Sequence, residues 1–329
     1  MAGTDGHADG PVAPPTTRPL ALSLLKLARP KQWSKSVFVL IGPVYGLGDM
    51  LQGGERDAWM VMAEAIVAAV AFALTSSGCY IINDIQDREA DRLHPRKRNR
   101  PIASGAVTVL LAISTAAVLF VAAASLLLLL APQARPWVAL TLGLYIANVV
   151  TYSFYLKQKV IGDVIGLSIG FVLRVMGGCA AVSIMPSTWL LNVTFFLSMF
   201  LAFGKRLGER RTMRKAPGGD GVGAHRAVQK LYTDVHLQMA VVVTMVATLM
   251  TYAAYVQTQD ERYTAGFNLL WLTLLPATYG LLRCIVLLEA GRYDDPTEMA
   301  FKDRGFIAAA IAFAIITLGA MFIALGGSG

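Results

Sequence analysis

Long apolar segments separated by short polar ones make up most of the chain. An α-helix needs about 20 apolar residues to cross a bilayer, and about nine segments approach that length. The first is the weakest, because it is short and interrupted by glycines, and it could lie partly at the interface. The segments cover roughly residues 36–52, 58–82, 106–130, 136–156, 162–183, 187–204, 236–257, 267–288 and 305–326. The pattern predicts an all-α, polytopic membrane protein with about nine transmembrane helices.

The composition agrees with this pattern and excludes an ordinary soluble protein. Hydrophobic residues make up 55% of the chain and charged residues 15%. We expect one membrane domain over residues 20–329. Residues 1–19 are rich in Gly, Pro, Ala and Thr, which predicts a disordered cytoplasmic tail rather than a signal peptide. The cysteines Cys79, Cys179 and Cys284 are isolated, so we expect them to be packing residues and not disulfide or zinc ligands.

Basic residues fall on one side of the predicted membrane layout. They precede the first segment and follow the second, fourth, sixth and eighth, whereas the opposite loops carry only Arg56, Arg135 and Arg262. The positive-inside rule therefore predicts a cell-membrane protein with a cytoplasmic N-terminus and an outside C-terminus. The net charge of +8 is then concentrated on the cytoplasmic face. It suits an anionic substrate or anionic headgroups, and we expect no nucleic-acid partner.

An acidic motif ends the second apolar segment. On a continued helix, Asn83, Asp84, Asp87 and Asp91 fall within one arc of roughly 100°, whereas Glu89 points the other way. Oxygen ligands at this spacing suit Mg²⁺, which completes its coordination with water and substrate phosphate. A solvated loop of mixed charge is the alternative, but four oxygen side chains on one face at a membrane boundary favour the metal site.

Cations follow the acidic motif directly. They are the residue types that bind phosphate oxygens, Arg by its planar fork and Lys as a point charge. The five are Arg92, Arg96, Lys97, Arg98 and Arg100. Together with the acidic motif they predict a membrane-embedded enzyme that acts on a diphosphate.

Further charged residues stand at or inside the ends of other segments. Residues 29–35 either anchor the chain at the interface or contribute Lys35 to a site. Lys157 ends the fourth segment and Asp163 opens the fifth, so they either pair across the turn or belong to the site. Lys205 and Arg206 end the sixth segment, where they serve a site or simply follow the positive-inside rule.

Two arginines lie within apolar segments. Arg174 is in the middle of the fifth, where an unpaired cation costs about 3 kcal/mol or more at the bilayer centre. We therefore expect Arg174 to face a polar cavity or a carboxylate. Arg283 lies inside the eighth segment.

The chain resembles the UbiA superfamily of intramembrane prenyltransferases. It is most similar to the branch that transfers phosphoribose to polyprenyl phosphates. The resemblance extends from about residue 20 to the C-terminus. It rests on an ordered set of motifs: residues 29–35 (RPKQWSK), 80–91 (YIINDIQDREAD), 94–103 (HPRKRNRPIA), 152–157 (YSFYLK), 172–174 (VLR), 204–206 (GKR), 295–298 (DPTE) and 302–304 (KDR).

The resemblance implies a nine-helix bundle with a cytoplasm-facing active site, often as a homotrimer. It implies Mg²⁺-dependent transfer of 5-phosphoribose from 5-phosphoribosyl 1-diphosphate to a polyprenyl, decaprenyl-like phosphate. By the same resemblance, the metal ligands would be Asn83 and Asp87. The catalytic carboxylates would be Asp84, Asp87, Asp91 and Asp163. The substrate-binding residues would be Lys35, Tyr80, Lys97, Arg98, Tyr152, Lys157, Arg174, Lys205 and Arg206.

Two alternative functions stay open at this stage. The first is transfer of a prenyl group from its diphosphate to an aromatic or lipid acceptor. Relatives with that activity generally carry a second aspartate cluster, where this chain has Lys157 and the single Asp163. The second is a non-enzymatic transporter, which Arg174 and Arg283 would suit. A transporter, however, should line a path through the bilayer with charge, and here nearly all charges lie on one face.

Overall fold

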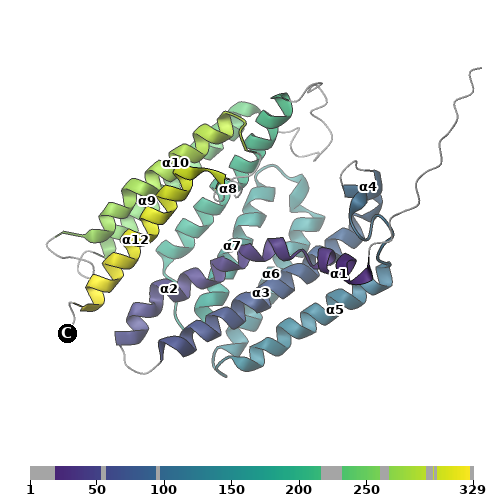
Figure 1. Cartoon of the computed structure of the whole chain (residues 1–329), viewed down its shortest axis with the longest axis horizontal. Coiled ribbons are helices and arrows are strands. Elements are labelled where there is room, and N and C mark those ends of the chain that lie inside the picture. The colour runs from purple at the N-terminus through teal and green to yellow at the C-terminus, as the bar shows by residue number, and fades with distance from the viewer. Residues whose placement is uncertain are drawn as a thin grey trace, which may run out of the picture.

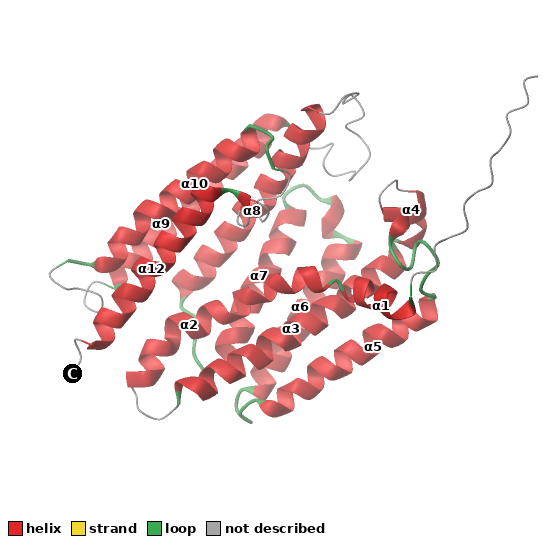
Figure 2. Ribbon diagram, viewed as in Figure 1, coloured by secondary structure: helices red, strands yellow, loops and turns green. Residues whose placement is uncertain are grey.

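The computed structural model describes residues 19–52, 57–93, 97–215, 232–259, 267–293, 299 and 302–326. Helices form its secondary structure (Figure 2). The predicted tail, residues 1–19, lies outside the described residues except for Pro19. The helices are α1 (Leu20–Ala28), η1 (Pro30–Ser36), α2 (Val37–Gln52), α3 (Ala58–Gln86), α4 (Arg88–Leu93), η2 (Lys97–Asn99), α5 (Val109–Leu126), η3 (Leu127–Leu129), α6 (Arg135–Phe154), η4 (Leu156–Gln158), α7 (Gly162–Ala181), α8 (Thr188–Lys215), α9 (Asp234–Thr258), η6 (Leu269–Thr273), α10 (Leu274–Glu289) and α12 (Arg304–Gly326).

The fold class is confirmed: the protein is an all-α, multi-pass membrane protein. In the described part of the chain, 8 helices are long and apolar enough to cross a membrane, and they match the second to ninth predicted segments. The first segment forms α2, whose 16 residues include Pro43. A total of nine crossings therefore stays a prediction, as does the orientation.

The sixth segment differs from its prediction, because α8 runs on to Lys215 and carries Lys205 and Arg206 on a helix rather than in a loop.

The long helices run side by side in one bundle with two neighbouring groups (Figure 1). In the N-terminal group α2, α3, α5, α6 and α7 enclose a core in which the ring of Phe72 meets that of Tyr145 edge-on at 5.8 Å. In the C-terminal group a second core joins α8, α9 and α10 around Phe200 and Leu288. The short α1 and α4 lie together at one end of the bundle (Figure 1). This end also carries the charged ends of α3 and α8, and it is called the polar end below.

Glycines let α2 approach α7 closely. A Cβ on Gly178 would collide with the backbone of Val39, and one on Gly42 would collide with the sulfur of Cys179. Earlier in α7, a Cβ on Gly166 would meet only side-chain atoms of Leu156 and Tyr152, at 3.0 and 3.2 Å. Small residues at such a crossing allow close helix packing within a membrane. The contact holds η1 and α2 against the helix that carries Arg174.

Hydrogen bonds fix the segment before α2 onto α3. The indole of Trp33 donates to the Ser77 hydroxyl at 3.0 Å, and that hydroxyl donates to the carbonyl of Ala28 at 2.6 Å. Trp33 itself is 40% exposed. These hydrogen bonds fix residues 29–35 at the polar end, and the two interpretations of this segment, an interfacial anchor or the source of Lys35 for a site, stay predictions.

Candidate active site at the polar end of the bundle

The acidic motif continues almost as one helix from α3 into α4. Asp87 caps the end of α3, where its N–H donates to the carbonyl of Asn83 at 2.9 Å. The N–H of Asp91 in turn donates to the carbonyl of Asp87 at 2.8 Å. The side-chain amide of Asn83 donates to Asp87 Oδ2 at 3.1 Å. These i to i+4 contacts keep Asn83, Asp87 and Asp91 on one side of the chain.

Arginines engage two of the aspartates completely. Arg29 Nη2 donates to both oxygens of Asp84, at 2.5 and 2.7 Å. Arg100 Nη1 bridges Asp84, at 3.0 Å, and Asp91, at 2.6 Å. Both carboxylates are buried, and Lys97 approaches Asp91 at 3.9 Å. Because charge-assisted contacts fill their oxygens, Asp84 and Asp91 tie three chain segments together, and their predicted catalytic role stays a prediction.

Asp87 is the open member of the motif. Its side chain is 32% exposed, and Lys157 Nζ lies 3.0 Å from its Oδ1. Lys157 is itself 28% exposed and comes from η4, 70 residues further along the chain. The suggested pairing of Lys157 with Asp163 across the turn is therefore wrong.

The residues present fit a metal ion that arrives with its substrate rather than one held in a protein cage. In the described ranges, no three His, Cys, Asp or Glu side chains are grouped so that they could hold a metal ion. Asn83 and Asp87 together still offer an amide oxygen and a carboxylate. Mg²⁺ is commonly bound by one or two carboxylates, with waters and substrate phosphates completing its octahedron. This pair suits such a partial site.

Arg174 is buried among hydroxyl groups. It is 4% exposed, and its Nη2 donates to Tyr145 Oη at 2.8 Å and to Ser76 Oγ at 3.3 Å. Its Nη1 donates to the carbonyl of Gly170 at 3.1 Å. Within the described part of the chain no carboxylate pairs with it, and its Nε has no hydrogen-bond acceptor. Arg174 thus meets hydroxyl groups and a backbone carbonyl rather than the predicted polar cavity or carboxylate, and no described side chain neutralises its charge.

Tyr80 connects the Arg174 cluster to the acidic motif. The guanidinium of Arg29 lies 5.1 Å from the centre of its ring. The charges of Lys35 and Arg174 both act on its hydroxyl, which also contacts Ser76. Arg29 and Lys35 from the segment before α2, and Arg174 from α7, thus all act on one tyrosine.

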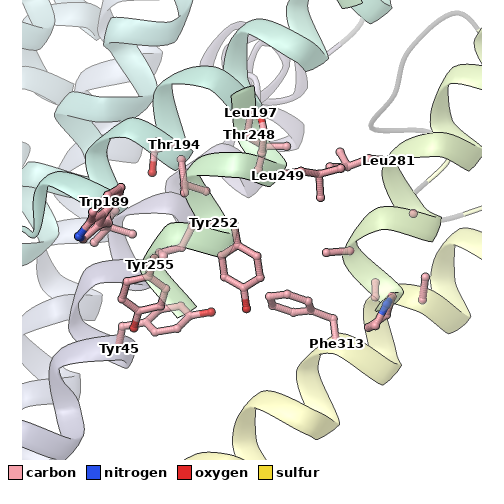
Figure 3. Close-up of a pocket in the computed structure, with 18 of the residues that line it drawn as sticks. Tyr45, Trp189, Thr194, Leu197, Thr248, Leu249, Tyr252, Tyr255, Leu281 and Phe313 are labelled. Atoms are coloured by element: carbon pink, nitrogen blue, oxygen red, sulfur yellow. The ribbon is translucent and has the colours of Figure 1, made fainter. Parts of the chain in front are cut away.

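A large apolar cavity lies beside this cluster, between α2, α8, α9, α10 and α12. Its volume is about 520 Å³, and aromatic rings line it (Figure 3). Phe38, one turn after Lys35, is part of its wall. The ring of Phe38 lies 4.7 Å from that of Phe171, which in turn lies 5.4 Å from the guanidinium of Arg174. The labelled lining residues include Tyr45, Trp189, Tyr252, Tyr255 and Phe313. The cavity was not predicted, because an apolar segment does not reveal which of its faces meets four other helices.

Asp163 and Arg206 form a separate, closed pair. Asp163 is 0% and Arg206 3% exposed. Arg206 donates through Nε to Asp163 Oδ2 at 3.0 Å and through Nη2 to the same oxygen. Tyr232 donates to Asp163 Oδ1 at 2.9 Å. Asp163 and Arg206 thus contact each other and Tyr232 inside the protein, and their predicted roles in catalysis and phosphate binding stay predictions.

The remaining predicted residues lie around the polar end. Arg98, in η2, and Lys205, on α8, are exposed. Tyr152 packs against Gly166 at the start of α7. Arg283 forms an ion pair with Asp303, at 2.5 Å from Nε to Oδ1, and this pair lowers the pKa of Asp303 to about 2. The motif at 295–298 and His94 to Arg96 lie outside the described residues.

Comparison with known proteins identifies the class. Residues 41–300 match the UbiA prenyltransferase family, and the chain belongs to that family. A UbiA homolog from Archaeoglobus fulgidus, solved with GPP and Mg²⁺ bound, has the same fold, with a TM-score of 0.61 at 16% identity over 92% of this chain and 99% of that one. The protein is thus a membrane-embedded transferase.

Relatives with an assigned activity narrow the class. The decaprenyl-phosphate phosphoribosyltransferase of Mycolicibacterium smegmatis is 34% identical over 89% of this chain and 91% of its own length. The enzyme of the same name from Corynebacterium glutamicum is 31% identical over 92% of this chain and 88% of its own.

Proposed function

We propose that this protein transfers 5-phosphoribose from 5-phosphoribosyl 1-diphosphate to a polyprenyl phosphate and releases diphosphate. The observation that carries the proposal is two separate places for anions along α3. One is the open Asp87–Lys157 pair, and the other is the buried, uncompensated Arg174 beside Lys35 and Tyr80. Two phosphate-bearing substrates need two such places. The names of the relatives that cover about nine-tenths of this chain agree with it.

The donor's diphosphate belongs at the open pair. Asn83 and Asp87 would hold Mg²⁺, which when bound neutralises the charge that develops on the leaving diphosphate. Lys157 would turn from Asp87 to a diphosphate oxygen, which costs little because both side chains are partly in water. The other cations of the polar end, Lys97, Arg98 and Lys205, would hold the 5-phosphate and the outer diphosphate oxygens.

The acceptor's phosphate belongs at Arg174. A dianionic phosphate there would neutralise the guanidinium, and Tyr80 and Lys35 would supply further donors. The route from this point into the apolar cavity passes Phe38 and Phe171. The cavity would take the first isoprene units of the lipid, since burying apolar surface stabilises the complex.

The reaction then needs no protein nucleophile. An oxygen of the lipid phosphate attacks the anomeric carbon of the ribose, and the bond from that carbon to the diphosphate oxygen breaks with its electron pair on diphosphate. The attacking oxygen is already anionic, so no general base has to remove a proton. The side chains bind, orient and neutralise. We place this site at the cytoplasmic face on the charge distribution of the loops, and the homotrimer stays a prediction from the resemblance.

Prenyl transfer to an aromatic or lipid acceptor is the second candidate, and the bound GPP in a structure of the same fold supports it. A second metal-binding aspartate cluster would have to use Asp163. Arg206 and Tyr232 already occupy both oxygens of that carboxylate, which disfavours this candidate. For a transporter, Arg283 offers no free charge on a path, because Asp303 neutralises it.

A two-way assay separates these functions. The purified protein in lipid nanodiscs with Mg²⁺ receives either ribose-labelled phosphoribosyl diphosphate and polyprenyl phosphate, or labelled prenyl diphosphate and an aromatic acid. We expect labelled lipid from the first pair only, and none of it when a chelator removes Mg²⁺. Product from the second pair alone would establish the prenyltransferase instead.

A further inference from the structure

The turn between Lys157 and α7 contains a strained residue. Ile161 has φ 67° and ψ −44°, and the N–H of Gly162 donates to the carbonyl of Val160 at 2.8 Å. These are the features of a γ-turn with positive φ at its centre, a rare and strained conformation. A β-branched side chain is among the least suited to it. Something outside the turn must hold Ile161 there.

Tyr232 is that external contact. The N–H of Ile161 donates to Tyr232 Oη at 2.6 Å, and the same hydroxyl donates to Asp163 Oδ1 at 2.9 Å. Tyr232 is buried, with its ring edge-on to Phe203 at 6.1 Å. Burial raises the pKa of Tyr232 to about 12, so its hydroxyl keeps its proton at neutral pH. It therefore serves as acceptor for Ile161 and donor for Asp163 at once.

The strained turn is connected to Lys157 by a short run of hydrogen bonds. The N–H of Lys159 donates to the carbonyl of Leu156 at 2.9 Å, and the N–H of Asp163 donates to the carbonyl of Lys159 at 3.0 Å. Lys157 therefore sits on a compact turn whose direction is set at Ile161. If Ile161 relaxes to negative φ, the chain leaves the turn in another direction and Lys157 Nζ moves away from Asp87.

We infer that Tyr232 is a positioning residue for the donor substrate: its hydroxyl holds Ile161 at positive φ and thereby places Lys157 beside Asp87. This inference rests on the proposed function, because it assigns Lys157 to the donor's diphosphate. The inferred role differs from that of a purely structural tyrosine in the quantity that a mutation should change, which is the binding of the donor. Loss of the hydroxyl should weaken donor binding and leave the binding of the lipid unchanged.

The first test is Tyr232→Phe, which keeps the ring on Phe203 and removes only the hydroxyl. The buried N–H of Ile161 then loses its acceptor, and we expect the KM for phosphoribosyl diphosphate to rise about tenfold. The KM for polyprenyl phosphate and kcat at saturating donor should stay within about twofold. The matched control is Tyr279→Phe on α10, whose hydroxyl accepts from Arg283 at 3.3 Å. It should change neither KM.

The second test is rescue by glycine at the strained position. Glycine adopts positive φ without steric cost, so Ile161→Gly added to Tyr232→Phe should bring the donor KM back to within about threefold of the wild type. The double variant also covers the case in which Tyr232→Phe alone folds poorly, because its turn no longer depends on the hydroxyl.

The outcomes separate this inference from the proposed function. An active wild type in which Tyr232→Phe leaves the donor KM unchanged, or raises both KM values equally, overturns the role of Tyr232 and leaves the proposed function intact. A double variant with a donor KM as high as that of Tyr232→Phe overturns the role of the strained turn. A wild type that forms no labelled lipid overturns the proposed function and this inference with it.

Discussion

Two carboxylate–cation pairs at the polar end differ in how far water reaches them. Asp163 and Arg206 are sealed between α7 and α8, and each carboxylate oxygen has an assigned donor. Asp87 and Lys157 meet through a single 3.0 Å contact, with about a third of each side chain exposed. Sequence alone makes all four residues equal candidates for chemistry. Their burial divides them into a pair that holds the fold and a pair that can exchange its contacts for a substrate.

The energetics of the two pairs follow from this difference. Removing one member of a buried ion pair leaves an uncompensated charge and costs about 3–5 kcal/mol of stability. An exposed pair contributes at most about 1 kcal/mol, so a metal ion or a phosphate can replace one of its members without endangering the fold. We therefore expect mutations in the two pairs to affect different measured quantities.

The largest effect should come from Asp87→Ala. It removes the one open carboxylate of the acidic motif, and we expect phosphoribosyl transfer to fall by at least about 10³-fold, because the metal's charge stabilisation is lost. The melting temperature of the purified protein should change little. Retained activity in this variant, with Mg²⁺ as the only added divalent ion, would rule out the metal role of Asp87.

Mutation of the buried Asp163–Arg206 pair should lower the stability of the protein instead. Arg206→Met leaves Asp163 buried without its cation, so we expect unfolding in detergent to become easier by about 3–5 kcal/mol. At a temperature where the variant is still folded, its Mg²⁺ requirement should equal that of the wild type. A variant of undiminished stability with a raised donor KM would show instead that Arg206 binds phosphate.

A smaller and more selective effect is expected from Lys157→Ala. Loss of one charge-assisted contact to the diphosphate should raise the donor KM about tenfold and leave the lipid KM unchanged. Lys159→Ala is the matched control, since Lys159 is an exposed lysine on the same turn. If both variants show the same donor dependence as the wild type, Lys157 does not clamp the donor.

The smallest effect is expected from a mutation in the apolar cavity, and it should concern the lipid substrate. Ala277→Trp narrows it, and we expect the lipid KM to rise by roughly fivefold with an unchanged donor KM, because the added ring displaces part of the tail. Leu275→Trp, on the exposed side of the same helix, is the control. Equal effects of both variants would place the tail elsewhere.

Much of the fold followed from local patterns. Apolar segments gave the membrane helices, and the helical period placed Asn83, Asp87 and Asp91 on one side of the chain, because both signals depend only on neighbouring residues. The helical period did not distinguish the exposed carboxylate from the other two, and only the family resemblance singled out Asp87 as a metal ligand. Asp84 and Asp91 are closed off by Arg29 and Arg100, and only the tertiary fold brings Arg29 from 55 positions away to Asp84.

Competing partners explain the other differences. Lys157 had Asp163 six positions away, yet the fold directs it to Asp87 across 70 positions. Tyr232 carried no signal, since a single tyrosine between apolar and charged residues is common. The positive φ of Ile161 is likewise invisible in a sequence where the following residue is the glycine.

The central claim is that Asp87, and neither Asp84 nor Asp91, holds the metal that comes with the diphosphate. The direct measurement is the initial rate of phosphoribosyl transfer as a function of Mg²⁺ concentration in three variants, Asp84→Asn, Asp87→Asn and Asp91→Asn, each with its melting temperature. We predict that only Asp87→Asn raises the Mg²⁺ requirement or abolishes the rate at an unchanged melting temperature. The other two should lower the melting temperature and keep the Mg²⁺ dependence of the wild type. A wild-type Mg²⁺ dependence in Asp87→Asn, with a shifted one in Asp84→Asn or Asp91→Asn, would contradict the claim.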